Sequence, residues 1–153
     1  MLYLQKQQGG HDMPKQQPQW QPISRLSLIA PHIDGMLAAA QDQYEAMLPA
    51  KAKPHVLDNY TVNRVKRVFT DQQHDLRLFD EQLTRWSKES LSAQQRVEVE
   101  RLQAQLKKLR EQITAILELA DDLEKGTIEK VMAKSDAELG LEFLLGQLKD
   151  KKL

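Results

Sequence analysis

Two stretches of the chain carry apolar residues in alternating steps of three and four. The first ladder is Val62, Val65, Phe69, Gln72, Leu76, Phe79, Leu83 and Trp86, and the second is Val99, Leu102, Leu106, Leu109, Ile113, Ile116, Ala120 and Leu123. This spacing places each ladder on one face of an α-helix and repeats with every heptad. Each ladder therefore predicts a long helix that buries one seam against another helix.

Polar residues at the ends of the ladders predict where these helices begin and end. Asp58 is a candidate N-cap for a helix that runs to about Lys88. Residues 92–95 read as a capping box that opens the next helix, which should end near Lys125 with Gly126 as its C-cap. Because the loop between the two helices is short, they should be antiparallel neighbours.

In an antiparallel hairpin the two ladders meet in reverse order, with Trp86 near Val99 and Val62 near Leu123. We therefore predict an all-α fold: an antiparallel helical hairpin with heptad seams, extended to a three- to five-helix bundle. The bundle domain should span residues 22–149, and the basic tail 150–153 should fray.

The N-terminal region differs in composition from the rest. Residues 1–21 are rich in Gln and Pro and carry too little apolar surface to offset their ordering entropy, so they should form a disordered tail. Trp20 either anchors a partner or, in the reading we favour, packs on the nearest helix. Because proline fits a first helical turn, Pro31 predicts a short turn or helix over about 23–29, followed by a main helix over about 31–48.

The C-terminal region is more apolar than one helical face requires. A short helix should span residues 127–134, and a second capping box at 135–138 should open another helix. Its main stripe, which should dock onto the hairpin, is Leu141, Leu144, Leu145 and Leu148. Leu139 and Phe143 lie partly off that stripe, so we predict that they form a face for a partner or a second copy.

Gln72 is the one polar residue in the first ladder. A polar side chain at a seam position lowers stability unless it is paired, and it can fix register or orientation. Gln72 is thus a candidate register residue, although its amide could equally reach the edge of the bundle.

Composition limits the cellular compartment and the classes of partner that we expect for this protein. The 22 basic residues balance 22 acidic ones, so no global charge attracts nucleic acid or an anionic membrane. Cysteine is absent, and no stretch has the length and apolar character of a secretory signal or a membrane span. These features are typical of a cytoplasmic protein, of bacterial type, that does not contact a membrane.

Residue patterns typical of catalytic, phosphate-binding or metal sites are scarce in the sequence. The glycines form no phosphate-binding loop, and the four histidines are scattered. Asp71 and His74 stand three residues apart, which is a metal-ligand spacing in helical bundles, but the second ladder's helix carries no histidine to complete a site. The sequence predicts no enzyme activity, no catalytic or metal-binding residue and no cofactor.

A local basic region surrounds the loop between the first and second helices. It contains Lys51, Lys53, Arg64, Lys66 and Arg67. If the hairpin forms, this region lies beside the acidic residues Asp121, Asp122, Glu124 and Glu129. We favour an ion-paired surface there. Contact with a nucleic-acid backbone is the alternative.

Together these features favour a non-enzymatic interaction or assembly protein that binds another protein or itself. A nucleic-acid-associated accessory factor that uses residues 51–67 is the second reading.

Overall fold

The fold is all-α, as the ladders predict. The structure is a computed structural model that describes residues 18–134, 140–141 and 144–145. Within residues 18–134 the α-helices are α1 (Leu26–Met47), α2 (Asn59–Ser87), α3 (Ala93–Glu124) and α4 (Ile128–Lys134). Three short 3-10 turns, Ile23–Arg25, Leu48–Lys51 and Pro54–Val56, precede α1 or connect α1 to α2. No strand occurs in this part of the chain.

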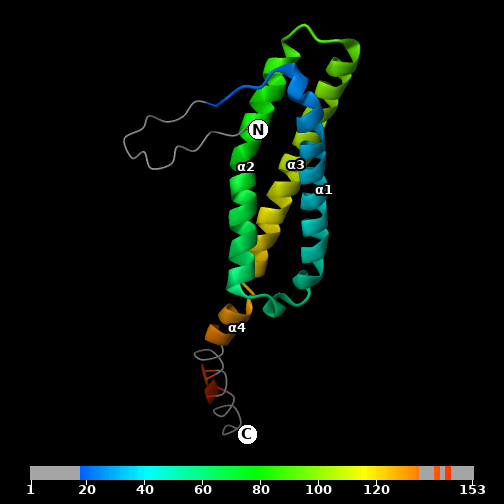
Figure 1. The fold of residues 1–153 in the computed structure, drawn as a ribbon. Coiled ribbons are helices and arrows are strands. Elements are labelled where there is room, and N and C mark those ends of the chain that lie inside the picture. The colour runs from blue at the N-terminus through cyan, green and yellow to red at the C-terminus, as the bar shows by residue number, and fades with distance from the viewer. Residues whose placement is uncertain (1–17, 135–139, 142–143, 146–153) are drawn as a thin grey trace, which may run out of the picture.

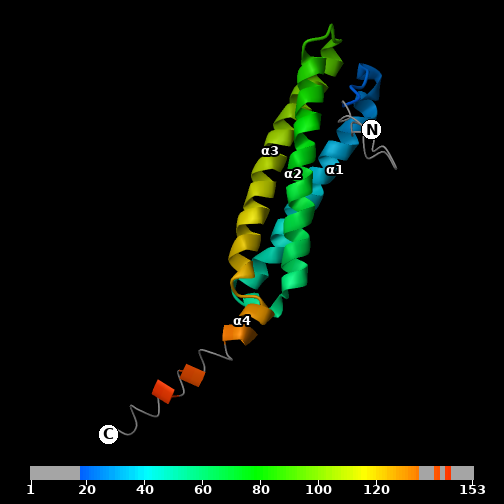
Figure 2. The ribbon, with the colours of Figure 1, turned by 90° about the vertical axis from the view of Figure 1, so that its left-hand side faces the viewer.

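The three long helices lie side by side, and α4 extends past one end of them (Figures 1 and 2). α3 packs against both α1 and α2. α2 runs antiparallel to α3, as predicted, and α1 runs in the same direction as α3 (Figure 1). With 32 residues, α3 is about 48 Å long.

The predicted N-caps of the two longest helices are confirmed. The Asp58 carboxylate accepts a hydrogen bond from the Thr61 amide over 2.7 Å. Hydrogen bonds from the side chain and the amide of Thr61 lower the pKa of Asp58. At the start of α3, Ser92 Oγ accepts from the Gln95 amide over 3.1 Å, and Gln95 Oε1 accepts from the Ser92 amide over 2.9 Å. These bonds satisfy amides that have no partner within their own helix.

The C-cap of α3 is Lys125 rather than the predicted Gly126, which follows it, and the reason for glycine there differs from the one expected. Its φ does not lie in the left-handed region that makes glycine the usual residue after a helix. Instead, a Cβ at this position would lie 2.6 Å from Pro54 Cγ. Close packing between the end of α3 and the loop before α2 therefore excludes a side chain there.

The predicted start of the first helix is wrong. α1 begins at Leu26, and Pro31 lies inside it rather than in its first turn. Proline has no N–H to donate to the carbonyl four residues earlier, so one backbone bond is lost. Leu26 and Ile29 before the proline are buried, and so is Ile33 after it. This burial on both sides holds the helix together across Pro31.

The ladder residues form most of the core. Every member of the second ladder is buried. In the first ladder, Val65 and Gln72 are half-buried and the others are buried. From α1, the buried side chains are Leu26, Ile29, Ile33, Leu37, Ala40 and Met47.

Ion pairs between α2 and α3 locate the register of the hairpin. Lys66 Nζ lies 2.8 Å from oxygens of both Asp121 and Glu124. In the predicted register, both acidic residues lie within about one and a half helical turns of the α3 residue that faces Lys66. Further along, Arg110 Nη1 lies 3.4 Å from Asp80 Oδ2.

A second set of ion pairs joins α1 to α3. Arg101 holds the Asp34 carboxylate with two hydrogen bonds of 2.9 and 2.8 Å, and it also contacts Glu98 at 2.6 Å. Gln105 adds a 3.0 Å hydrogen bond to Asp34. The bonds from Arg101 lower the pKa of Asp34 more than its slight burial raises it, and those to Asp34 and Glu98 raise the pKa of Arg101.

The segment before α1 lies against the C-terminal end of α2. The Gln21 amide donates to Gln82 Oε1 over 2.6 Å, and the Gln21 carbonyl accepts from Trp86 Nε1 over 2.9 Å. Trp20 stacks on the Arg85 guanidinium, which lies 4.3 Å from the ring centroid. Trp20 thus packs on the nearest helix, as we favoured, while residues 1–17 of the predicted tail lie outside the described residues.

Candidate interaction surfaces

The basic region is only partly neutralised by its acidic neighbours. Lys66 forms the predicted ion pairs, and its bonds to Asp121 and Glu124 raise its pKa. The other four basic residues, Lys51, Lys53, Arg64 and Arg67, are exposed and form no ion pair with any residue in the described ranges. The favoured ion-paired surface is therefore confirmed at Lys66 alone.

The acidic residues beside this region have separate roles. Asp122 lies 3.7 Å from Lys125, in the last turn of α3. Glu129 Oε2 accepts a 2.8 Å hydrogen bond from the Asn59 amide at the start of α2. A carboxylate at the N-terminus of a helix is favourable because the first amides and the helix dipole attract negative charge.

The start of α4 is bound firmly to the loop before α2. The Ile128 amide donates to the Leu57 carbonyl over 2.8 Å, and the Thr127 hydroxyl donates to Asn59 Oδ1 over 2.6 Å. Thr127 is completely buried. These bonds, with the one from Asn59 to Glu129, fix the direction in which the chain leaves the bundle.

Beyond this anchor, the C-terminal region presents apolar side chains to solvent. Ile128, Val131 and Met132 of α4 are 46, 44 and 62% exposed. Leu141, Leu144 and Leu145 are helical and 57, 57 and 50% exposed. We call α4 and these three leucines the C-terminal arm.

The predicted docking of the leucine stripe onto the hairpin is therefore wrong for Leu141, Leu144 and Leu145. The anchored start of α4 directs the chain past the end of the bundle instead of back along it (Figure 2). Leu148 lies outside the described residues, and so do Leu139 and Phe143, the predicted partner face.

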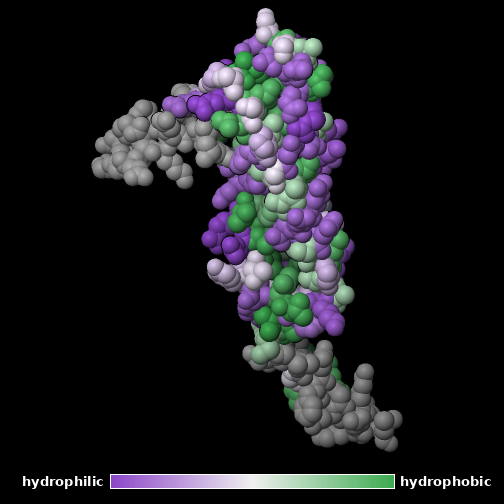
Figure 3. All heavy atoms as spheres, turned by 45° about the vertical axis from the view of Figure 1, so that its right-hand side comes forward, coloured by the Kyte–Doolittle hydropathy of each residue, from purple (hydrophilic) through white to green (hydrophobic). Residues whose placement is uncertain are grey.

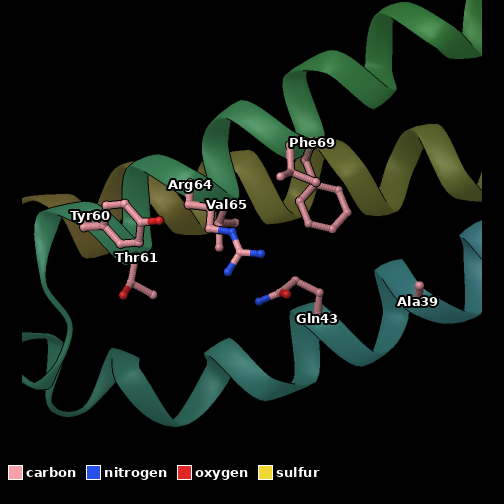
Figure 4. Close-up of a pocket in the computed structure, with 8 residues that line it drawn as sticks. Ala39, Gln43, Tyr60, Thr61, Arg64, Val65 and Phe69 are labelled. Atoms are coloured by element: carbon pink, nitrogen blue, oxygen red, sulfur yellow. The ribbon is translucent and has the colours of Figure 1, made fainter.

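A groove of about 390 Å³ lies between α1 and α2. Its lining residues are Ala39, Gln43, Tyr60, Thr61, Arg64, Val65, Val68 and Phe69. Phe69 and Arg64 point from α2 toward α1, and Gln43 points back from α1 (Figure 4). The groove therefore combines an apolar floor with the guanidinium of Arg64.

This groove lies where hydrophobic side chains reach the surface of the bundle. Tyr60 and Val68 are 71 and 48% exposed. Hydrophobic residues also appear between hydrophilic ones over the half of the bundle nearer α4 (Figure 3). A second hollow, of about 410 Å³, lies at the other end between the start of α1 and the start of α3.

Gln72 is unusual among the polar residues of the core. Its Oε1 atom is buried and has no hydrogen-bond partner in the described part of the chain. The amide oxygen therefore does not reach water at the bundle edge. The side chain as a whole is half-buried, and a role in register or orientation stays a prediction.

The polar contacts that join distant segments have little signal in the sequence. Gln82 is 1% exposed and bonds to Gln21. The one feature of the sequence that could have indicated the burial of Gln82 is its place directly before the ladder residue Leu83 and one turn before Trp86. Asp34 and Arg101 lie 67 residues apart, and neither residue has neighbours that indicate the pairing.

A metal site needs several ligating side chains close together, and the described residues lack such a cluster. They contain no group of three or more His, Asp or Glu side chains that could hold a metal ion. Nor does any helix among them have the length and apolar character needed to cross a membrane.

Comparison of the chain with models of known families, with curated proteins and with solved structures gave no match. Inferences about function therefore depend on the surfaces described above.

Proposed function

We propose that this chain is a non-enzymatic assembly protein that binds another protein or a second copy of itself through its C-terminal arm. The observation that supports this proposal is the exposure of six large apolar side chains along the arm. Exposed apolar surface is unfavourable in water, and a large patch of it marks protein–protein contacts. The sequence places Leu139 and Phe143 on the same segment, and both belong to the proposed binding face.

In this proposal the three long helices act as a rigid scaffold. The two ladders serve as heptad seams of coiled-coil type between α2 and α3, and Gln72 fixes their register. The proposal keeps a bundle of three to five helices of this chain, with the three long helices at its centre. No cofactor takes part, and the proposed compartment is the cytoplasm.

The test is sedimentation velocity of the full chain and two double variants. Leu141→Glu with Leu144→Glu places charge in the arm, whereas Val97→Glu with Glu100→Gln changes an exposed part of α3. The arm variant should lose association, and the α3 variant should keep it. Circular dichroism should show the same helix content in both. The proposal would be contradicted if the arm variant still associated with itself and still bound the proteins that the parent chain captures.

The second candidate function, binding to a nucleic-acid backbone, has one observation in its favour. Lys51, Lys53, Arg64 and Arg67 are exposed without ion-pair partners among the described residues. Phosphate contacts made by such residues weaken steeply as salt rises. A gel shift on generic DNA and RNA, repeated with Lys51→Glu and Lys53→Glu together, should lose a salt-sensitive complex if this candidate is right. No complex at low salt would contradict it.

A further inference from the structure

The packing of the three long helices leaves one side of the bundle incomplete. α3 contacts α1 and α2 closely, whereas the groove separates α1 from α2 over the region from Tyr60 to Phe69. Four-helix bundles fill such a space with another helix, whose apolar stripe packs on both neighbours. The groove thus has the position that a fourth helix would occupy.

The size of the groove suits a short helical segment. From Tyr60 to Phe69 it follows α2 for about 14 Å, which is about two and a half helical turns. Ala39 on the opposite wall has only a methyl group, so another backbone can approach closely. A helix that fits must present apolar residues three and four positions apart.

The C-terminal arm presents such residues. Leu141, Leu144 and Leu145 stand at i, i+3 and i+4, are helical, and remain half or more exposed. Their combined stripe extends over about one turn, which is shorter than the groove.

Charge matches the groove to the part of the chain that follows α4, since α4 itself carries both Glu129 and the cations Lys130 and Lys134. Arg64 lines the groove and forms no ion pair with the described residues, and the exposed cations Lys51, Lys53 and Arg67 belong to the same end of the bundle. The sequence from 135 to 148 carries Asp136, Glu138 and Glu142 and no Lys or Arg. Opposite charges on two surfaces steer their association and set its orientation.

We propose that the C-terminal arm of one copy binds in the α1–α2 groove of a second copy, so that two chains exchange arms in a dimer. This inference depends on the proposed function and names its partner and its docking surface. A reciprocal exchange uses the same two surfaces on each chain, as a two-fold dimer requires. The second copy is the occupant because the bonds of Ile128 to Leu57 and of Asn59 to Glu129 direct the arm away from its own groove.

Cross-linking tests the exchange directly, because the chain has no cysteine. A tagged chain with Val68→Cys is mixed with an untagged chain carrying Leu144→Cys and then oxidised. The expected product is a disulfide-linked mixed dimer. Val97→Cys replaces Val68→Cys in the control, since Val97 is an exposed valine on α3 that does not line the groove. A yield from Val68→Cys no higher than from the control would overturn the inference.

A single chain carrying both Val68→Cys and Leu144→Cys distinguishes exchange from folding back. Exchange predicts linked dimers whose yield rises with protein concentration. A cross-linked monomer formed at high dilution, without dimer, would show that the arm occupies its own groove and would also overturn the inference.

Charge reversal separates this inference from the proposed function. Arg64→Glu should raise the dimer dissociation constant at least tenfold, whereas Arg77→Glu, an exposed arginine of α2 outside the groove, should change it less than twofold. If Leu144→Glu abolishes self-association but Arg64→Glu and Val68→Glu leave it unchanged, the arm binds elsewhere, so the inference fails while the proposed function stands. If none of these variants changes association, both fail.

Discussion

Trp86 donates a hydrogen bond from its indole Nε1 to the main-chain carbonyl of Gln21 over 2.9 Å. The same carbonyl accepts a 3.3 Å bond from Gln82 Nε2, and Gln82 Oε1 accepts from the Gln21 amide. Gln82 and Trp86 lie one turn apart on α2 and are both buried. Two buried polar side chains are therefore satisfied by one residue of the segment that precedes α1, so this segment belongs to the folded unit.

The first prediction concerns Gln82. Replacement by leucine keeps most of its volume but leaves the Gln21 amide and carbonyl without the side-chain amide that pairs with them. Gln82→Leu should lower the free energy of unfolding by about 1 to 3 kcal/mol, the usual effect of leaving buried polar groups unsatisfied. Urea denaturation followed by circular dichroism measures this change. A variant as stable as the parent would show that water replaces the lost bonds.

The same substitution at Gln72 should have the opposite effect. Gln72 Oε1 is buried without a hydrogen-bond partner among the described residues, so leucine removes an unfavourable burial. Gln72→Leu should leave stability unchanged or raise it by up to about 1 kcal/mol. Because a polar seam residue can fix register, the variant should also populate a wider range of oligomers in sedimentation velocity. Lower stability with the same oligomers would mean that Gln72 makes a required hydrogen bond.

The parts of the fold that the sequence predicted are those governed by local periodicity. The second ladder is buried at every position, and Asp58 and Ser92 cap the helices they precede. Each of these features depends on residues within a few positions of one another. Heptad spacing and capping residues can therefore be recognised in a single sequence.

The features that the sequence did not predict depend on long-range contacts. Whether α1 continues through Pro31 is decided by burial on both sides of the proline. The Asp34–Arg101 pair and the groove between α1 and α2 arise only when three helices meet. The leucine stripe has the same spacing whether it docks or remains exposed, and the bonds at the start of α4 decide between the two.

Two glycines provide a matched test of close packing. At Gly126 an alanine Cβ would lie 2.6 and 2.7 Å from Pro54 Cγ and Cβ, whereas at Gly35 it would meet no atom within 4 Å. Gly126→Ala should lower the free energy of unfolding by about 1 to 3 kcal/mol, because the loop must move. Gly35→Ala lies inside α1 and should raise it by about 0.5 to 1 kcal/mol.

Thermal melts of both variants check these signs. Equal stability of Gly126→Ala and the parent would show that the loop around Pro54 shifts freely. In that case the start of α4, which binds the same loop through Leu57, would be less firmly oriented than the bonds indicate.

The last prediction concerns pH and the ion pair between α1 and α3. Hydrogen bonds from Arg101 hold the pKa of Asp34 below its usual value of 3.8. The unfolded chain therefore binds this proton more readily than the folded chain does. The contribution of Asp34 to stability is complete well above pH 3.8 and is lost as the pH falls through the lowered pKa.

Asp34→Asn should remove this contribution. At pH 7 the loss should be under about 1 kcal/mol, because both partners are more than a third exposed and water screens the pair. The difference between parent and variant should shrink as the pH falls below about 4. Asp42→Asn is the control, since Asp42 is exposed on the same helix and forms no ion pair with the described residues. Urea midpoints measured from pH 7 to pH 2 test this, and a constant gap between parent and Asp34→Asn would show that the Asp34 carboxylate does not act through its charge.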